Sequence, residues 1–442
     1  MTDRVAPLVA RYFAGSRGEL RVGGMPIGLI AERYGTPLFV YDARVMEQKW
    51  RLLRNALTAE FTIAYSVKAN PNPAVVEYFL ARQCDLEIAS AGEFHCALRA
   101  GCPPGRILFA GPGKTDAELE LVLKESIGEI HAESPGEIRR ITAVAERLGV
   151  RAPVALRVNP GSAAQGGAMR MGGKPAPFGV DEEAIEPVLD ELMSAASVEF
   201  RGVHLFAGTQ ILDHTVLIAQ YRRGLEIAER IALRISRPLH TVDFGGGLGI
   251  PYFPGEQELD MDGLRNEIGS LMTETRARPT FAGTRFVVEP GRYLVGEAGI
   301  YVARVVDIKA SRGKRFLVLD GGMHHHLAAS GNLGQVIKRS FPIGLLNRLE
   351  ESPTDTVDIV GPLCTPLDTL ARDTRLPRAR VGDLVGIFQS GAYGRTASPL
   401  SFLSHPTPPE VLVEDGHDRL IRRRGAYQDM FRDLPSFSGP TD

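Results

Sequence analysis

The chain has 442 residues, of which 44% are hydrophobic and 24% are charged, and its net charge is −2 at pH 7. This composition is ordinary for a soluble globular protein, and the length exceeds the usual size of one domain, so we expect two domains. A nearly neutral chain creates no field that would attract nucleic acid or an anionic membrane surface.

Targeting signals and cysteine spacing favour the cytoplasm. The N-terminal stretch MTDRVAPLVARYFAGSRGEL has charges within its apolar runs and lacks a secretory leader pattern. No stretch reaches the ~18 uninterrupted apolar residues that span a bilayer. The four cysteines form no CxxC pair and no disulfide framework. We therefore expect a cytoplasmic protein with reduced thiols that binds neither membranes nor nucleic acid.

The first predicted strand is 36–42, and short apolar runs alternate with helical patterns from residue 43 to 295. The segment 214–235 has apolar residues at the 3- and 4-residue spacing of a helix that covers a sheet. Eight strands, each followed by a helix, are typical of a (β/α)₈ barrel, although a doubly wound sheet gives a similar pattern. The predicted barrel strands are 62–68, 85–90, 106–111, 128–134, 154–160, 200–208, 241–247 and 285–291.

After residue 295 the pattern changes to strands separated by turns, with few helical segments. The predicted strands of this part are 299–310, 314–322, 356–362 and 382–394. We therefore predict an α/β protein with a (β/α)₈ barrel at 43–295 and a C-terminal β domain at 296–442, which residues 1–42 complete.

Polar residues and glycines end the barrel strands, which is where such barrels carry their functional groups. A glycine triplet lets backbone N–H groups approach an anion such as phosphate, although it also forms plain turns. A carboxylate beside a pyridine nitrogen keeps the ring protonated, and a lysine can bond covalently to a carbonyl group. The strand-end candidates are Lys68, Glu87, Ser90, Arg157, Asn159, His204, Thr209, Gly245, Gly246, Gly247, Glu289 and Arg292.

Seven motifs follow one another along the chain: YSVKANPNP, HLFAGTQ, DFGGGLGI, VEPGRYLV, DGGM, GPLCTPLD and GAYG. Over roughly residues 25–405 they resemble the pyridoxal 5′-phosphate (PLP)-dependent decarboxylases of the alanine-racemase-type fold, which include the ornithine, arginine and diaminopimelate decarboxylases. The resemblance implies that PLP is the cofactor and that Lys68 holds it covalently. It also implies that His204 stacks on the ring, Gly245 to Gly247 bind the phosphate, and Glu289 pairs with the pyridine nitrogen. The predicted cofactor site is completed by Glu87, Thr209, Arg292 near the phosphate, and Tyr393, which closes over it.

The motif GPLCTPLD gives information on the assembly of subunits and on the substrate. In the family its cysteine reaches into the active site of the partner subunit, so the resemblance implies a homodimer with shared active sites in which Cys364 protonates the carbanion left by CO₂. An acidic residue usually follows and meets the distal amine of the substrate; this chain has Thr365, with Asp368 three positions on. This departure argues against a simple diamine-forming substrate. The candidate substrate-binding residues are Thr365, Asp368 and His324.

Further departures resemble a side branch of the family. HLFAGTQ is two residues longer than the usual HxGS form, and residues 163–183 form a long Gly- and Met-rich loop, interpreted as a lid. The branch includes carrier-protein-dependent decarboxylases, such as the glutamyl-carrier enzyme of butirosin assembly and a methylaspartyl counterpart in macrolactam assembly, and exosortase-associated decarboxylases. We predict an amino acid substrate of the acidic, carrier-tethered kind. The alternatives are free diaminopimelate, ornithine or lysine, or the exosortase-associated activity.

Each candidate also has a plain structural interpretation. Lys68 could cap a strand, His204 could be a core histidine, and Cys364 could be an inert thiol. Glu289 and Arg292 could form a structural ion pair. An alanine-racemase-type enzyme pairs the pyridine nitrogen with arginine and uses a tyrosine as second base, which Glu289 and Cys364 disfavour. A non-catalytic PLP-binding protein would need neither the β domain nor Cys364.

Two clusters fall outside this chemistry. We predict no metal site at 323–327, MHHHL, because consecutive side chains on a strand point to alternate faces. The basic cluster 419–427, RLIRRRGAY, is interpreted as a solvated face. If the substrate arrives on an acidic carrier protein, this cluster becomes a candidate landing surface.

Overall fold

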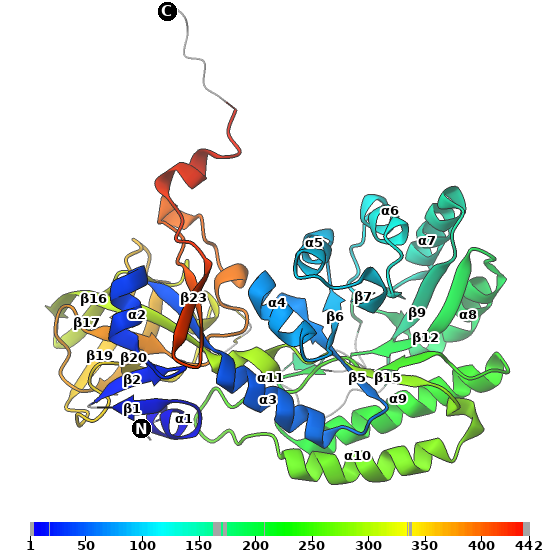
Figure 1. Ribbon diagram of the computed structural model, residues 1–442, viewed down its shortest axis with the longest axis horizontal. Helices are drawn as coiled ribbons and strands as arrows, with labels where there is room; N and C mark the ends of the chain where they lie inside the picture. Colours follow the sequence, from blue (N-terminus) through cyan, green and yellow to red (C-terminus); the bar gives the residue numbers. More distant parts are fainter. Residues whose placement is uncertain are drawn as a thin grey trace, which may run out of the picture. The chain divides into compact units, whose positions relative to one another are not determined.

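The computed structural model describes residues 4–16, 18–161, 169–170, 175–206, 208–333, 335 and 338–435 (Figure 1). The chain divides into two compact units, one of residues 48–251 and 256–294 and the other of residues 1–47, 252–255 and 295–442. Within the 163–183 loop that the sequence indicates as a lid, residues 163–168 and 171–174 lie outside the described residues.

The first unit is a closed barrel of parallel strands. β8 pairs with both β7 and β9, and β15 pairs with both β14 and β5, so the sheet has no free edge among these strands. This closure confirms the (β/α)₈ prediction and excludes a doubly wound sheet, which stays open. The barrel strands are β5 (Phe61–Ser66), β6 (Asp85–Ile88), β7 (Ile107–Phe109), β8 (Glu129–Ala132), β9 (Ala152–Asn159), β12 (Val198–Leu205), β14 (Thr241–Asp243) and β15 (Arg285–Val288).

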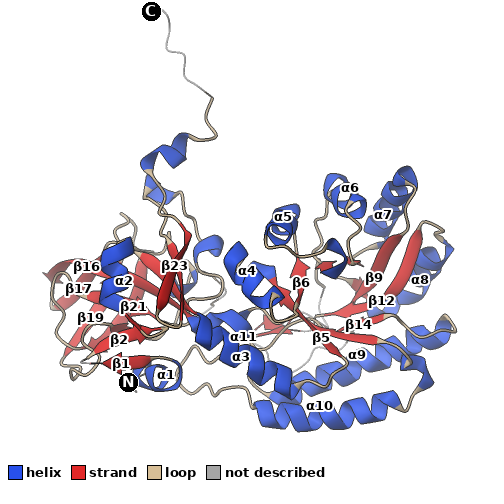
Figure 2. Cartoon of the chain, in the orientation of Figure 1, coloured by secondary structure: helices blue, strands red, loops and turns tan. Residues whose placement is uncertain are grey.

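Helices lie outside the barrel strands (Figure 2). Many begin at a side chain that accepts a hydrogen bond from the first turn; Ser90, Thr115 and Ser134 cap α5, α6 and α7 in this way. Such caps start each helix close behind the preceding strand, which keeps the loops at the carboxyl ends of the strands short. The barrel helices are α4 (Pro73–Leu80), α5 (Ala91–Arg99), α6 (Asp116–Lys124), α7 (Pro135–Leu148), α8 (Ile185–Ser194), α9 (His214–Arg234), α10 (Met261–Arg276) and α11 (Arg292–Val295), with α3 (Ala43–Ala56) preceding β5.

The second unit is a mixed β-sheet to which both ends of the chain contribute. β4 (Leu38–Asp42) runs antiparallel to β16 (Gly299–Ser311) and parallel to β22 (Glu410–Glu414). The predicted N-terminal strand therefore completes a sheet built mainly from C-terminal residues. The remaining strands are β17 (Lys314–Leu319), β18 (Ile343–Leu345), β19 (Asp355–Val360), β20 (Thr369–Leu376), β21 (Leu384–Ile387) and β23 (His417–Arg422), and the main order is β20-β19-β17-β16-β4-β22-β23.

Elements that precede β4 in the sequence pack against this sheet. α1 (Val5–Tyr12), α2 (Ile27–Tyr34) and the small sheet β1 (Ala14–Ser16), β2 (Glu19–Val22) and β3 (Met25–Pro26) precede it. Buried side chains of α2 and β2 pack with those of β4, β16 and β22 in one hydrophobic core. Among the described residues, no helix is long and apolar enough to cross a membrane.

Candidate active site

The end of β5 carries Lys68 to the mouth of the barrel. β5 stops at Ser66, and a 3₁₀ turn over Val67–Ala69 follows. Lys68 Nζ lies 2.8 and 2.6 Å from the two carboxylate oxygens of Glu87 on β6, and Ser66 Oγ donates to the same carboxylate. Glu87 is buried, whereas the side chain of Lys68 is 42% exposed. A buried carboxylate therefore holds an accessible amine, which a solvated strand cap would not require.

The segment after β15 lies beside the segment that carries Lys68. A Cβ added at Gly291 would come within 2.9 Å of Ala69 Cβ, so the two backbones are too close for a side chain there. Glu289 follows β15, and Arg292 begins α11. The structure thus brings Lys68, Glu289 and Arg292 to the same end of the barrel, as predicted.

The glycine triplet after β14 adopts backbone conformations that suit glycine. Gly245 has φ +67° and Gly247 has φ +104°, in the left-handed region that other residues rarely adopt. Gly245 N donates to Asp243 Oδ1 at 2.7 Å. This bond leaves the amides of Gly246 and Gly247 as the candidate phosphate ligands of the triplet.

Two neighbouring segments hold the glycine loop in place. Glu289 N donates to Gly245 O at 2.8 Å, and Ile211 N donates to Gly247 O at 2.9 Å. Thr209 ends the short strand β13 (Gly208–Thr209), two residues before Ile211. The predicted phosphate residues Thr209 and Gly245 to Gly247 therefore lie on adjacent loops, and the glycine loop is also bonded to the segment of Glu289.

His204 and Glu289 form a buried pair. His204 Nε2 lies 3.3 Å from Glu289 Oε2, and both side chains are buried. Burial lowers the pKa of His204 to about 4. Burial alone would raise the pKa of Glu289, but the imidazoles of His204 and His131 and the ammonium of Lys68 draw it well below its usual range. Glu289 is therefore an ionised carboxylate inside the barrel.

Three further buried titratable residues surround this pair, and the sequence reading did not select them. His131 Nε2 lies 3.2 Å from Glu129 Oε1 and 3.9 Å from Asp243 Oδ2. The His131 and His204 rings are stacked, with centroids 4.3 Å apart and an interplanar angle of 20°. The available signal was the alternation within EIHAES, since residues two apart on a strand face the same side. Glu129 and His131 therefore both point into the barrel.

Glu133, which the sequence reading also missed, organises the loops beyond β8. Its carboxylate accepts hydrogen bonds from Arg157 Nη1 at 2.6 Å, Gly111 N at 2.7 Å and Gly179 N at 3.0 Å. Nearby, the buried Lys114 donates to Glu137 at 2.9 Å. Arg157, a predicted strand-end residue, thus pairs with a buried anion at the mouth.

The remaining predicted residues belong to the β domain. Cys364 is an exposed free thiol, and Thr365 is half-buried. Asp368 is buried, and its carboxylate accepts hydrogen bonds from Met323 N at 2.6 Å and Leu363 N at 2.9 Å. Tyr393 has φ +52°, a backbone conformation that is uncommon for tyrosine. The roles of these residues toward substrate and phosphate stay predictions.

The prediction that residues 323–327, MHHHL, lie on a strand was wrong. Met323, His324 and His325 form a turn, and the His324 and His325 ring centroids lie 3.7 Å apart. His324 is fully buried, and neither of its ring nitrogens has a hydrogen-bond partner within the described ranges. Among the described residues, metal-ligand spacing occurs away from this turn, where the ligand atoms of His131, His204, Asp243 and Glu289 lie within 4.8 Å of one another.

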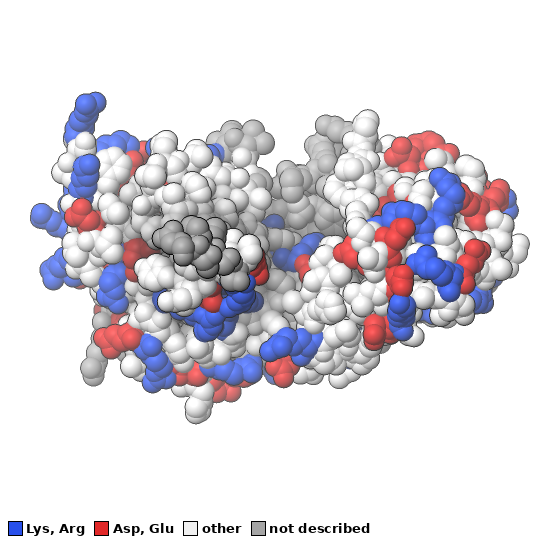
Figure 3. Space-filling model, turned by 90° about the horizontal axis from the view of Figure 1, so that it is seen from above, with Lys and Arg blue, Asp and Glu red and all other residues white. Residues whose placement is uncertain are grey.

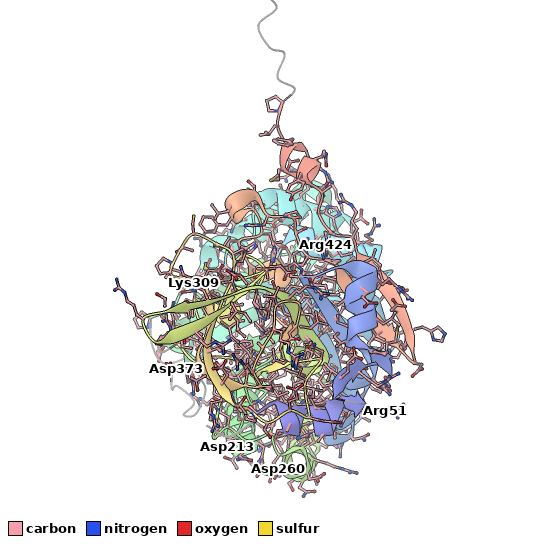
Figure 4. The ribbon with its side chains drawn as sticks, turned by 90° about the vertical axis from the view of Figure 1, so that its left-hand side faces the viewer. Arg51, Asp213, Asp260, Lys309, Asp373 and Arg424 are labelled. Carbon is pink, nitrogen blue, oxygen red and sulfur yellow. The ribbon has the colours of Figure 1, made fainter. Side chains whose placement is uncertain are left out.

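The basic cluster 419–427 is largely engaged within its own unit. Arg422 pairs with Glu410, and Arg423 pairs with Asp429 at 2.7 Å. Arg424 donates to the carbonyls of Tyr34 and Pro37, beside the end of α2 (Figure 4). Acidic and basic side chains are also interspersed on the face seen in Figure 3. These contacts favour the structural interpretation of the cluster over a landing surface.

Comparison with known proteins identifies the class. Residues 43–296 match the family model "Pyridoxal-dependent decarboxylase, pyridoxal binding domain". The L-glutamyl-[BtrI acyl-carrier protein] decarboxylase of Niallia circulans is 37% identical over 407 residues, 91% of this chain and 95% of that protein. The diaminopimelate decarboxylase of Zymomonas mobilis is 32% identical over 427 residues, 95% of this chain and 98% of that protein. The crystal structure of diaminopimelate decarboxylase from M. jannaschii in co-complex with L-lysine superposes with a TM-score of 0.88 at 26% identity, covering 96% and 98% of the two chains.

The chain therefore belongs to the PLP-dependent decarboxylase family of the ornithine, arginine and diaminopimelate enzymes. It is a carboxy-lyase whose cofactor is PLP and whose substrate is an amino acid. The barrel residues fit this cofactor on their own chemistry. Glu289 Oε1 is buried without a hydrogen-bond partner among the described residues, as the acceptor for a pyridinium N–H must be before the ring binds. The accessible amine of Lys68 and the glycine loop lie at the same end of the barrel.

Proposed function

We propose that the protein α-decarboxylates an acidic amino acid, of the glutamyl or methylaspartyl type, tethered by its side-chain carboxyl to an acyl carrier protein in natural-product biosynthesis. The observation that carries this proposal is the 37% identity, over 91% of the chain, with an enzyme whose name describes a carrier-bound glutamyl substrate. Tethering through the side chain leaves the α-amino and α-carboxyl groups free, as PLP chemistry at Cα requires.

The segment GPLCTPLD supports a substrate that lacks a distal ammonium group. Asp368 is its only acidic residue, and two backbone amides, those of Met323 and Leu363, already donate to that buried carboxylate. Thr365 offers a hydroxyl where the family usually has an acid. A distal ammonium would therefore meet no free carboxylate in this segment, whereas a thioester carries no charge that needs one.

The barrel residues divide the work of holding the cofactor. Bound PLP supplies an electron sink for the electron pair that remains when the α-carboxyl leaves as CO₂. We assign Lys68 to covalent attachment, His204 to the ring face and Glu289 to the ring nitrogen. Glu87 orients the Lys68 amine, since both of its oxygens lie within 2.8 Å of Nζ. The phosphate is assigned to Thr209, Gly245, Gly246, Gly247, Arg292 and Tyr393.

We further propose a homodimer in which the β domain, residues 1–42 and 296–442, contributes to the interface and to the partner's active site. Cys364 supports this assignment because it is an exposed thiol three residues before Leu367, which is 51% exposed. A second subunit would cover both side chains. After the C–CO₂ bond has broken, the thiol proton of Cys364 goes to Cα, and the thiolate is later reprotonated from solvent.

The test is CO₂ release by the PLP-loaded protein from free amino acids and from glutamyl and methylaspartyl thioesters on a carrier protein or pantetheine. Turnover confined to the thioesters supports the proposal. Rapid turnover of a free amino acid with none of the thioesters contradicts it. Cys364→Ser and Cys364→Ala, compared with the buried Cys102→Ala as control, test the proton donor: loss of the correctly protonated product, with CO₂ release retained, is expected at Cys364 alone.

A second candidate is decarboxylation of free diaminopimelate. It is favoured by the 32% identity with the Zymomonas mobilis diaminopimelate decarboxylase over 95% of the chain. The same CO₂ measurement distinguishes the two candidates, because diaminopimelate is offered as a free amino acid and the glutamyl and methylaspartyl groups are offered as thioesters.

A further inference from the structure

The barrel core beneath the cofactor site contains an unusual number of buried charges. Glu129, Asp243 and Glu289 place three carboxyl groups around the two stacked imidazoles of His131 and His204, and all five side chains are buried. They come from four strands or strand ends: β8, β12, β14 and the end of β15. Buried like charges repel strongly, so such a cluster persists only if protons and hydrogen bonds compensate it.

One carboxyl group of the cluster is shifted toward its protonated form. Burial and the neighbouring Glu289 carboxylate raise the pKa of Asp243 well above its ordinary value. Asp243 also accepts the Gly245 N–H through Oδ1. Glu129 and Glu289 remain as the two ionised carboxylates of the core, because the pKa of each is lowered despite burial.

His204 contacts one of these two carboxylates, with Nε2 3.3 Å from Glu289 Oε2. Lys68 is bound by Glu87 at 2.6 Å, and Arg285 adds a more distant positive charge to Glu129. His131 lies between the two carboxylates. Its Nε2 is 3.2 Å from Glu129 Oε1, and its Nδ1 is 3.9 Å from Glu289 Oε1.

We propose that His131, anchored by Glu129, is a positioning residue: its ring lies between the Glu129 and Glu289 carboxylates and against the His204 ring, and so holds Glu289 in place to accept the N–H of the PLP ring nitrogen. The backbone of β8 is fixed for this purpose, since Lys114 Nζ donates to His131 O at 2.8 Å. The stacked His204 ring fixes the plane of the imidazole. Without the His131 ring, Glu289 loses this support, accepts the ring N–H less well, and leaves the ring a weaker electron sink.

The experiment uses the PLP-loaded enzyme and reads the ring nitrogen directly, by nitrogen-15 NMR of labelled PLP, at pH 6 to 9. His131→Gln is expected to move the ring-nitrogen signal at pH 7 toward that of neutral pyridine and to lower kcat roughly tenfold or more, which is the factor for one pKa unit. Glu129→Gln is expected to shift both in the same direction by a smaller amount. His240→Gln is the control, because His240 is an exposed barrel histidine whose Nδ1 contacts Thr241 Oγ1 at 3.1 Å.

The double variant decides whether the two residues act as a unit. If Glu129 acts through His131, the Glu129→Gln/His131→Gln double variant resembles His131→Gln alone. An unchanged ring-nitrogen signal in His131→Gln overturns the proposal, even if its thermal stability falls. If His131→Gln does not fold, Glu129→Gln carries the test: its signal shifts if the proposal holds and stays unchanged if it does not. Stoichiometric zinc in the purified holoenzyme, lost on His131 substitution, would also overturn it, because the four ligand-spaced side chains would then hold a cation.

Discussion

Gly246 lies directly against the main chain of Glu289: a Cβ added to Gly246 would be 2.5 Å from the Glu289 carbonyl oxygen. Neither backbone can yield easily, because Glu289 N is also bonded to Gly245 O at 2.8 Å. The loop assigned to the phosphate and the carboxylate assigned to the ring nitrogen therefore share one rigid contact. The two ends of the cofactor site are positioned together.

Substituting Gly246 tests this coupling. Gly246→Ala is expected to weaken PLP binding at least tenfold and to lower the free energy of unfolding by about 1–3 kcal/mol, because overpacking shifts the backbone. PLP titration of the apoprotein and thermal unfolding measure the two effects. Gly269→Ala is the matched control: it lies in α10, and an added Cβ meets nothing within 4 Å. Equal PLP affinity in the two variants would contradict the coupling.

Buried neutral histidines predict how stability depends on pH. Burial lowers the pKa of His204 and His324 to about 4 and that of His326 to about 3, from an ordinary value of 6.5. The unfolded chain binds protons at these residues below pH 6.5, whereas the folded chain does not. The free energy of unfolding is therefore fully retained above pH 6.5 and falls as the pH drops toward 4, by on the order of 2 kcal/mol per imidazole between pH 7 and pH 5.

Thermal unfolding of the holoenzyme from pH 7 to pH 5 measures this dependence. His326→Gln is expected to flatten it, because one imidazole that must charge on unfolding is gone. The exposed His240→Gln should leave it unchanged. A pH dependence identical in all three proteins would show that His326 does not contribute.

Substitutions of Asp368 distinguish a structural role of this residue from a role in substrate binding. Its carboxylate accepts the Met323 and Leu363 amides, so Asp368→Ala is expected to cost about 1–3 kcal/mol of stability by leaving buried donors unpaired. Asp368→Asn should lose less, since its amide oxygen can still accept one N–H. Thermal unfolding and KM for substrate are measured together. A raised KM with unchanged stability would restore the prediction that Asp368 binds substrate.

Hydrophobic periodicity predicted most of the fold, and the polar residues at strand ends predicted most of the residues at the mouth of the barrel. Each of the eight barrel strands and the strand at 36–42 gave an apolar run that the structure confirms, because buried parallel strands are apolar on both faces. Lys68, Glu87, Gly245 and Glu289 come together because strand ends of a closed barrel meet at one mouth. In contrast, α1 and α2 were missed, since each helix has only eight residues, which is about two turns.

The buried cluster of Glu129, His131, His204, Asp243 and Glu289 was not predicted from the sequence for a different reason. Glu129 and His131 lie inside an apolar run, where single polar residues are usually taken as solvent-facing. Their inward direction becomes visible only when the barrel closes and β8 pairs with β9. The turn at 323–325 was also misjudged, because MHHHL was taken to lie on a strand. Proton sharing among residues from four strands cannot be recovered from the spacing of any one of them.

Thr365 offers the sharpest test of substrate choice. Thr365→Glu places a carboxylate where the family usually has an acid, beside the exposed Cys364, and is expected to introduce or raise CO₂ release from free diaminopimelate or ornithine while lowering that from glutamyl thioesters. The physical reason is that a distal ammonium gains an ionic partner, whereas an uncharged thioester gains only an unpaired anion. Thr365→Gln is the matched control, with the same length and no charge. If Thr365→Glu and Thr365→Gln change the ratio of the two activities equally, charge at this position does not select the substrate, and the argument from GPLCTPLD for a carrier-tethered amino acid fails.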